Sequence, residues 1–169
     1  MRLRPIKEAD LPDLERRWAT DPDTVGEHNW TGWSNARWTK RWQEDRLLGE
    51  RPVLLIEVGA TVVGFVDWHS LETGGHGSFC WEFGLSLWPD ERGKGYGTLA
   101  QRQLAEYLFA HSTANRVQAW TETGNIAEQR SLEKAGFTRE SVLRGYSFRG
   151  GAWRDVVYYG MLRDELTTS

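Results

Sequence analysis

Three glycines, Gly93, Gly95 and Gly97, stand at alternate positions between an alternating apolar segment and a segment with helical spacing. Glycine loses more conformational freedom on folding than alanine, so this pattern indicates a local need for bare backbone. Backbone N–H groups at the start of a helix lack intrahelical partners and lie at the positive end of the helix dipole. Without side chains in the way, a phosphate can reach these donors directly. The pattern therefore favours a pyrophosphate-binding loop over a tight turn with positive φ, which would account for only one or two of the glycines.

The residues beside these glycines narrow the kind of phosphate ligand. Arg92 and Lys94 add positive charge to the loop. Thr98 stands where the dinucleotide-binding pattern G-x-G-x-x-G requires its third glycine. Lys94 is followed by Gly95, and not by the Ser or Thr with which a P-loop holds magnesium. Because both spacings are missing, a nucleotide-binding protein is the least favoured of the alternatives.

The segment upstream of the glycines, residues 78–88, alternates between two kinds of side chain and predicts a strand. One face is bulky and suits a core. The other is small apart from the carboxylate of Glu82, which leaves room beside it for a ligand. An isolated acid of this kind is usually an ordinary surface residue, but its place just before the glycine loop makes Glu82 a candidate for chemistry. The bulky face holds Phe79, Trp81, Phe83, Leu85 and Leu87, and the small face holds Cys80, Glu82, Gly84 and Ser86.

The composition limits the classes of function. The 169 residues predict a single domain, residues 1–169, with 21 basic and 24 acidic side chains and a net charge of -3. This balance argues against a nucleic-acid binder that relies on neutralising phosphates. Cys80 is the sole cysteine and the four histidines show no ligand spacing, so we predict no disulfide and no metal site. No apolar run has the length of a signal peptide or a membrane span, so a cytoplasmic protein without a membrane partner is the default expectation.

The rest of the sequence predicts strands and helices that mix without strict alternation. This order favours an α/β sandwich, in which helices flank a mixed sheet, over a doubly wound parallel sheet. Asp10 and Ser34 are candidate N-caps for the first two helices. The predicted helices cover residues 11–20, 34–48, 98–111 and 126–135, and the predicted strands cover residues 1–6, 52–58, 61–68, 78–88, 116–120, 141–149 and 152–162.

A second informative segment is N-I-A-E-Q-R-S-L-E-K-A-G-F, residues 125–137. Asn125 is a good N-cap, and Glu128 three residues later can complete a capping box. Gly136 follows the helix where a left-handed C-cap is expected. A stripe of small side chains, one every four residues, can allow tight packing on the sheet or can let an extended ligand lie against the helix. Its members are Ala127, Ser131 and Ala135.

These segments resemble the signatures of a known superfamily. The stretch from Arg92 to Gly97 is similar to the R/Q-x-x-G-x-G/A loop of the GNAT acetyltransferases, and residues 125–137 are similar to their N-x-x-S/A-x-x-x-x-E-K-x-G-F helix. The carboxy-terminal run from Ser147 to Glu165 resembles the RimJ/RimL-type branch. The resemblance extends from about Val53 to Glu165. It implies the GNAT fold, an α/β structure in which about four helices flank a mixed, mostly antiparallel central sheet of about seven strands.

The resemblance implies that acetyl-CoA is the co-substrate, bound between the strand of residues 78–88 and the strand of residues 116–120. Backbone groups of the first strand would pair with the pantetheine arm, and N–H groups of the glycine loop would hold the pyrophosphate. A backbone N–H near Leu85 would polarise the thioester carbonyl. The implied coenzyme-binding residues are Leu85, Ser86, Leu87, Arg92, Gly93, Lys94, Gly95, Tyr96, Gly97, Thr98 and Asn125.

By the same resemblance, the chain transfers an acetyl group directly to an amine. Glu82 is the candidate general base, because an ammonium must lose a proton before it can attack. Many family members have a tyrosine in the second signature as general acid, but Leu132 stands at that position here. Ser131 and Asn125 are the candidate groups for the departing thiolate. Further alternatives are Tyr146, Tyr158 and Tyr159.

Tryptophans crowd the segment that in GNAT proteins covers the acceptor. Trp38 and Trp42 lie four residues apart and are expected to pack inward on one helical face. Trp30 and Trp33, with Glu27, could line a pocket that holds a cationic amine through cation–π contact. The expected acceptor is a small-molecule amine or a peptide or protein amino terminus, and an antibiotic acceptor would make the chain a resistance enzyme. A catalytically silent acyl-CoA sensor and a homodimer are alternatives that the sequence leaves open.

Overall fold

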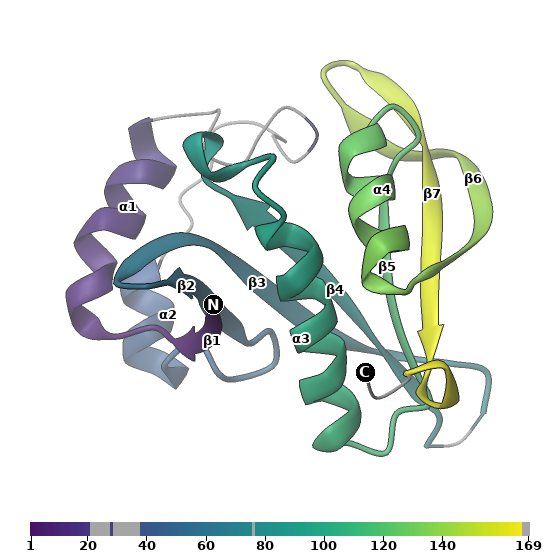
Figure 1. Cartoon of the computed structure of the whole chain (residues 1–169), viewed down its shortest axis with the longest axis horizontal. Coiled ribbons are helices and arrows are strands. Elements are labelled where there is room, and N and C mark those ends of the chain that lie inside the picture. Colours follow the sequence, from purple (N-terminus) through teal and green to yellow (C-terminus); the bar gives the residue numbers. More distant parts are fainter. Residues whose placement is uncertain (21–27, 29–37, 76, 167–169) are drawn as a thin grey trace.

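The computed structural model describes residues 1–20, 28, 38–75 and 77–166, and these residues are built around a seven-stranded sheet (Figure 1). The strand order is β1-β2-β3-β4-β5-β7-β6. The predicted mixed sheet with flanking helices is confirmed. The strands are β1 (Arg2–Pro5), β2 (Val53–Val58), β3 (Thr61–Glu72), β4 (Phe79–Leu87), β5 (Arg116–Glu122), β6 (Thr138–Arg149) and β7 (Ala152–Leu162), and the α-helices of the described part are α1 (Leu11–Thr20), α2 (Trp38–Asp45), α3 (Tyr96–Ala110) and α4 (Ile126–Ala135).

Neighbouring strands are antiparallel except β4 and β5, which run parallel. Their pairing is short, since only Trp81 with Val117 and Glu82 with Gln118 lie opposite each other. Both strands continue beyond these pairs and separate. Each backbone N–H and C=O needs a partner, so the open edges can pair with an extended ligand. The predicted splay between these two strands is therefore present.

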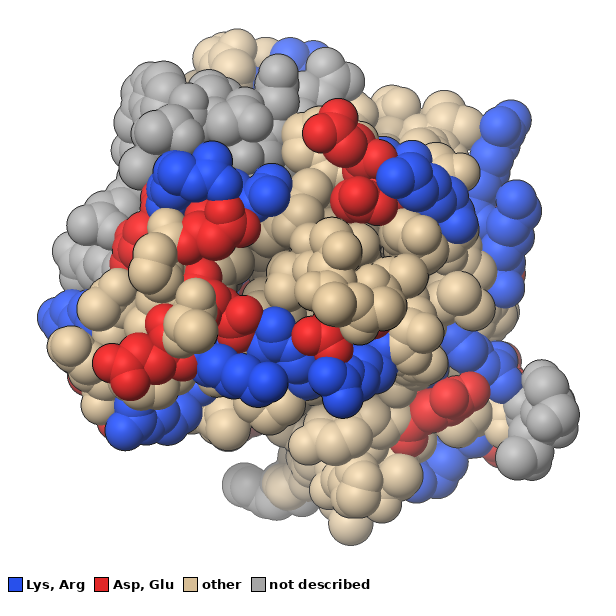
Figure 2. All heavy atoms as spheres, turned by 60° about the vertical axis from the view of Figure 1, so that its left-hand side comes forward, with Lys and Arg blue, Asp and Glu red and all other residues tan. Residues whose placement is uncertain are grey.

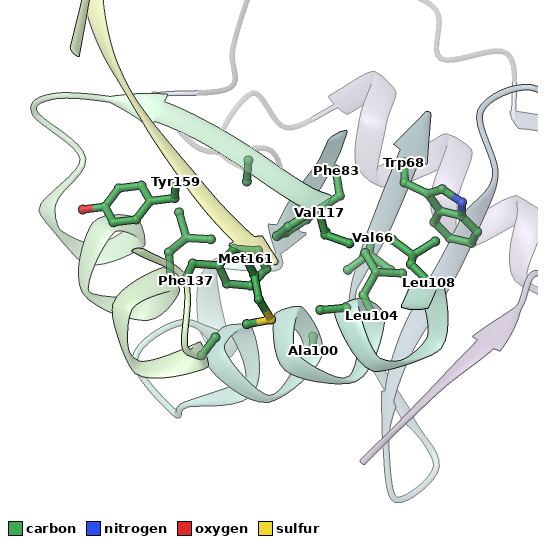
Figure 3. Close-up of a cluster of buried hydrophobic side chains, with 14 of the residues drawn as sticks. Val66, Trp68, Phe83, Ala100, Leu104, Leu108, Val117, Phe137, Tyr159 and Met161 are labelled. Carbon is green, nitrogen blue, oxygen red and sulfur yellow. The ribbon is translucent and has the colours of Figure 1, made fainter. Parts of the chain in front are cut away.

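One face of the sheet packs against α3 and α4. Figure 3 shows Leu104 and Leu108 of α3 in the same cluster as Val66 and Val117 of the sheet. Leu104, Val66 and Val117 are completely shielded from solvent. Burial of each such side chain contributes roughly 1.5–3 kcal/mol. This interface fixes α3 on the sheet, and with it the glycine loop from which α3 starts.

Helices α1 and α2 cover part of the opposite face through an aromatic core. Trp38 of α2 contacts Phe65 of β3 with ring centroids 5.4 Å apart, and Trp18 of α1 lies 5.6 Å from Trp38. Trp42 packs against the same cluster, and the guanidinium carbon of Arg46 lies 3.8 Å from its ring centre. Trp38 and Trp42 thus pack inward, as predicted.

Two details of the first helices differ from the prediction. Helix α2 ends at Asp45 instead of residue 48, because the next two residues adopt positive φ values of 59° and 56°. Asp10 does not cap α1. Residues 8–10 form a short 3-10 turn, so the Asp10 carboxylate reaches back to accept the N–H of Lys7 at 2.7 Å. The predicted cap Ser34 lies outside the described residues.

Charged side chains of both signs are interleaved on the α1 side of the molecule (Figure 2). Arg4 is held between Asp10 and Glu57, and Asp13 pairs with Arg17 along α1. These basic groups are neutralised by neighbouring acids, so they add no excess positive charge to this side. In the part of the chain that the structure describes, no helix combines the length and apolar character needed to cross a membrane.

The residue that follows α4 tests the prediction that a left-handed C-cap requires glycine. Gly136 has a left-handed φ of 97°, as predicted, and a Cβ atom there would lie 3.2 Å from Nη1 of Arg102 and 3.3 Å from Cε of Met161. We expect Gly136→Ala to lower the free energy of unfolding by about 1–2 kcal/mol, measured by urea denaturation. Gly124→Ala is the matched control, because a Cβ atom there meets no atom within 4 Å and φ is not positive. An equal loss in both variants would contradict the explanation.

Candidate active site

The glycine loop joins β4 to α3 through two left-handed residues. Gly93 has a φ of 75° and Gly95 a φ of 82°, and Gly95 is the N-cap of α3. A Cβ atom at either position would meet no protein atom within 4 Å. The backbone conformation therefore requires glycine here, and open space lies around these two residues. The first-turn N–H groups of α3 have no intrahelical acceptor and can donate to a ligand in front of the helix.

Gly97 is required for a different reason. It lies in the first turn of α3, where a Cβ atom would come within 3.2 Å of Oγ of Ser131 and 3.7 Å of Leu87. The absence of a side chain thus allows α3 to approach α4 and the end of β4. The sequence argument assigned all three glycines to phosphate access. In the structure, the left-handed backbone accounts for Gly93 and Gly95, and close packing against Ser131 accounts for Gly97. The fold of the loop therefore requires all three glycines without reference to a ligand.

A pocket of about 430 Å³ opens between the end of β4, the glycine loop and α4. Ser131, a predicted partner of the thiolate, lines this pocket. Two of the predicted coenzyme-binding residues direct their side chains elsewhere: Tyr96 packs against the core, and Lys94 forms an ion pair with Glu91 at 2.9 Å. The other nine line the pocket and are Leu85, Ser86, Leu87, Arg92, Gly93, Gly95, Gly97, Thr98 and Asn125.

Among the described residues, the arginine and lysine side chains that line this pocket are Arg92, Arg130 and Lys134, and the acid Glu128 belongs to the same lining. Arg92 folds back over the loop, and its Nε donates to the carbonyl of Leu87 at 3.0 Å. Arg130 and Lys134 come from α4 and were not identified from the sequence. Ala127 and Ser131 of the small-residue stripe also line the pocket, so these four residues of α4 occupy positions i, i+3, i+4 and i+7. This spacing defines one helical face and is a signal that could have found them.

Helix α4 is tied to α3 by a chain of hydrogen bonds along the pocket wall. Asn125 caps α4 as predicted, since its Oδ1 accepts the N–H of Glu128 at 3.3 Å. Glu128 does not complete the capping box, because its Oε1 instead accepts Nε2–H of Gln101 at 2.6 Å. Gln101 accepts the hydroxyl of Ser131 at 3.1 Å, and Oγ of Ser131 lies 3.2 Å from Oγ1 of Thr98. The Ser131 hydroxyl is therefore already engaged as a donor.

Glu82 lies on the sheet face opposite α3, at the point where β4 and β5 stop pairing. Its Oε2 accepts Nε2–H of Gln118 at 2.8 Å, and its Oε1 accepts Nε1–H of Trp120 at 3.2 Å. Nε2 of His69 is 3.9 Å from Oε1. Glu82 is only 9% exposed, and Cys80 beside it is buried, so the small face is less open than expected. The two donors from β5 fix the carboxylate beside the splay.

None of the described residues that line the pocket is a tyrosine, so the pocket lining offers no tyrosine as a partner for the predicted thiolate. Leu132, at the position of the family tyrosine, is completely buried in the core. The hydroxyl of Tyr159 donates to Oε1 of Glu133 at 2.9 Å, away from the pocket. Ser131 and Asn125 are therefore the predicted thiolate partners that do line the pocket.

The structure describes only part of the segment that was predicted to hold the acceptor amine. Trp30, Trp33 and Glu27 lie outside the described residues. His28 is described; it lines the pocket, and its Nδ1 is 3.2 Å from Oε2 of Glu122. The same Glu122 carboxylate accepts two hydrogen bonds from the guanidinium of Arg149, which comes from the end of β6. Within the described residues, no three His, Cys, Asp or Glu side chains are grouped so that they could hold a metal ion.

The geometry of loop, pocket and carboxylate agrees with a known family. A family model described as "Acetyltransferase (GNAT) domain" matches residues 1–138. The chain belongs to the GNAT acetyltransferase family. The matched region includes the glycine loop, the strand that carries Glu82 and the whole of α4. The family predicted from the two sequence signatures is thereby confirmed.

Known proteins agree with this GNAT assignment. The uncharacterized N-acetyltransferase YnaD of Bacillus subtilis (strain 168) is 30% identical over 89 residues, which are 53% of this chain and 52% of YnaD. The chain spans about half the length of the curated relatives it matches. RimJ of Mycobacterium smegmatis, solved in complex with CoA-disulfide, has a TM-score of 0.81 at 21% identity, covering 99% of this chain and 84% of RimJ. The spermidine N-acetyltransferase of Vibrio cholerae, solved with CoA and spermine, has a TM-score of 0.78 at 16% identity, covering 98% of this chain and 96% of that one.

The carboxyl of Glu128, which lines the GNAT pocket, makes stability depend on pH. Burial raises the pKa of Glu128 from 4.5 to about 7, although the hydrogen bond from Gln101 opposes the rise. Because the folded state prefers the protonated form, this contribution is complete below about pH 4.5 and is lost as the pH rises through about 7. We expect Glu128→Gln, which cannot ionise, to melt at a higher temperature than the parent protein at pH 8, with the difference shrinking toward pH 5.

Thermal unfolding followed by circular dichroism between pH 5 and 8 measures this difference. Glu106→Gln is the control, because this acid lies on the exposed side of α3 and should give no such trend. A Glu128→Gln protein that melts below the parent protein at pH 8 would count against the burial of an ionisable carboxyl at this position.

Proposed function

We propose that this chain is an acetyl-CoA-dependent N-acetyltransferase that passes an acetyl group directly to a primary amine. The observation that carries the proposal is the separation of β4 from β5, because it brings a pocket for an elongated anionic ligand next to a carboxylate. The RimJ structure contains CoA-disulfide and the spermidine N-acetyltransferase structure contains CoA, which supports the same class of ligand here.

The pocket residues suit the successive parts of acetyl-CoA. We assign the N–H groups from Gly93 to Thr98 to the pyrophosphate, with the three basic side chains of the pocket nearby. Lys94 and Tyr96 would contribute through their backbone only, since their side chains are engaged elsewhere. The open edge of β4 from Leu85 to Leu87 would pair with the amides of the pantetheine arm. The open space around the two left-handed glycines, Gly93 and Gly95, leaves room for the coenzyme.

In the proposed reaction, the amine nitrogen attacks the carbonyl carbon of the thioester. A C–N bond forms, the C–S bond breaks, and the coenzyme leaves as a thiolate. The proton of the amine passes to the carboxylate of Glu82, directly or through water. A backbone N–H near Leu85 stabilises the negative charge on the carbonyl oxygen. Gln118 acts as a positioning residue, because its amide holds the carboxylate in place.

The departing thiolate has two polar neighbours in this proposal. The Nδ2 group of Asn125 donates to Oγ1 of Thr121 at 3.0 Å, and the Ser131 hydroxyl donates to Gln101. Ser131 is the better candidate, because a hydroxyl can rotate toward the sulfur without disturbing the cap of α4. A thiol with a pKa of about 8.5 leaves readily as a thiolate, so Ser131 would assist departure and need not donate a full proton.

Two classes of acceptor fit this chemistry, a small-molecule amine and a peptide or protein amino terminus. An antibiotic that carries a primary amine would make the chain a resistance enzyme. The second candidate function is a catalytically silent acyl-CoA sensor, which would keep the pocket and show no turnover. The carboxylate that two donors fix beside the splay favours the enzyme over the sensor.

The role of Glu82 is tested by Glu82→Gln. We expect kcat for amine acetylation to fall by about 10²–10⁴-fold, the usual contribution of a positioned general base. The dissociation constant of acetyl-CoA should stay within about twofold, because Glu82 does not line the coenzyme pocket. Thiol release in the presence of primary amines, aminoglycosides and short peptides measures turnover, and calorimetry measures coenzyme binding.

Glu72→Gln is the matched control for this test, since Glu72 is an exposed acid on the neighbouring strand β3 and should leave both quantities unchanged. Full turnover in Glu82→Gln would remove Glu82 from the role of base. Coenzyme binding by the unaltered protein without turnover on any amine would instead support the sensor.

A further inference from the structure

Glu82 differs from the neighbouring acids in how its charge is balanced. Those acids are neutralised by arginine. Glu82 is bound by the neutral donors of Gln118 and Trp120, while Nε2 of His69 lies at 3.9 Å, beyond hydrogen-bonding range. The two hydrogen-bond donors to this shielded carboxylate are uncharged, and no described arginine or lysine pairs with it, so a cationic ligand could serve as its charged partner. The neutralised pairs are Asp67–Arg51, Glu122–Arg149 and Glu140–Arg116.

Three aromatic rings, which we call the aromatic corner, stand beside this carboxylate: Trp120, Tyr146 and Tyr158. The ring centroids of Trp120 and Tyr146 are 5.6 Å apart with an interplanar angle of 73°. Those of Tyr146 and Tyr158 are 5.8 Å apart at 87°. The Tyr158 hydroxyl donates to the Tyr146 hydroxyl at 2.9 Å. Burial raises the pKa of Tyr158 well above its usual value, so its hydroxyl stays protonated.

The aromatic corner leaves ring surface open to a ligand. Trp120 is 37% exposed and Tyr146 is 47% exposed, although both rings pack against a neighbour. Rings set nearly at right angles form two walls of a corner, and their faces attract a cation placed within about 6 Å. Trp120 belongs to both features, because its N–H holds Glu82 while its ring forms a wall.

We propose that Glu82 and the aromatic corner form the acceptor site, and that the acceptor is a small organic primary ammonium ion with an apolar body. The carboxylate would bind the ammonium group, and the ring faces would hold the carbons attached to it. This inference rests on the proposed acetyl transfer and names its substrate class. It also assigns the aromatic wall of the acceptor site to residues of β5, β6 and β7, where the sequence argument had placed it at Trp30 and Trp33.

A peptide fits this surface less well. The chain that follows an amino terminus carries backbone N–H and C=O groups, each of which needs a partner when it is buried. The aromatic corner offers ring faces, and its two hydroxyls are bonded to each other. An apolar carbon body needs no such partners and gains from contact with the rings. The corner therefore favours a small amine over an extended peptide.

Phenethylamine, a primary amine with an apolar ring, is the probe for a kinetic test. We expect Tyr146→Ala to raise its KM by about tenfold, because one wall of the corner is lost. Tyr146→Phe should keep KM within about twofold, since it retains the ring. Trp153→Ala is the matched control, because Trp153 is 67% exposed on the same hairpin but makes an edge-to-face contact with Phe148, outside the corner. An unchanged KM in Tyr146→Ala, or a higher kcat/KM for alanine-initiated peptides than for phenethylamine, would overturn the proposal.

A binding test separates this inference from the proposed reaction. Titration of the protein with phenethylamine in the presence of CoA should shift the Trp120 indole resonance, which Trp120→Phe identifies by its disappearance. The neutral analogue 2-phenylethanol should bind at least about tenfold more weakly, because it lacks the charge that Glu82 and the rings attract. A shift without acetylation would support the acceptor site and reject the proposed reaction. Acetylation with equal binding of amine and alcohol would reject the acceptor site alone.

Discussion

The short parallel pairing of β4 with β5 constrains everything else in the site. The two strands share only the pairs at Trp81 and Glu82, and beyond them each presents an open edge. Backbone groups on an open edge must find partners, and an extended ligand can supply them. The pocket lies beside the glycine loop and α4, and the carboxylate of Glu82 lies on the opposite face of the sheet, where the pairing ends.

The two faces of the sheet differ in electrostatic character where β4 and β5 separate. On the side of α3 and α4, the first-turn N–H groups and the basic side chains of Arg92, Arg130 and Lys134 favour an anion. On the opposite side, the charge of Glu82 is met by neutral donors and aromatic rings, which favour a cation. An anionic coenzyme and a cationic acceptor would therefore approach from different faces. The backbone between the strands would keep them apart except where the reacting atoms meet.

Several contacts serve the fold and the site at once. The chain of hydrogen bonds from Glu128 through Gln101 to Ser131 locks α4 onto α3, and it also sets the back wall of the pocket. Gly97 allows the close approach of these helices and at the same time lines the pocket. Glu122 joins His28 to Arg149, which come from opposite ends of the chain. A change at any of these positions would alter both stability and ligand geometry.

Local patterns in the sequence were enough to predict most elements of the fold and many of the residues that line the pocket. The alternation of β4, the cap at Asn125 and the left-handed end at Gly136 depend on a few neighbouring residues, whose spacing follows the period of a strand or a helix. One local rule failed because of a partner distant in the sequence: the capping box at Asn125 stays incomplete, since Glu128 accepts a hydrogen bond from Gln101 instead. The partners of Glu82 show the same limit. Gln118 and Trp120 come from β5, 36 and 38 residues further along the chain, and only the register of β5 against β4 brings them to the carboxylate. That register joins strands far apart in the chain, and no short-range spacing encodes it.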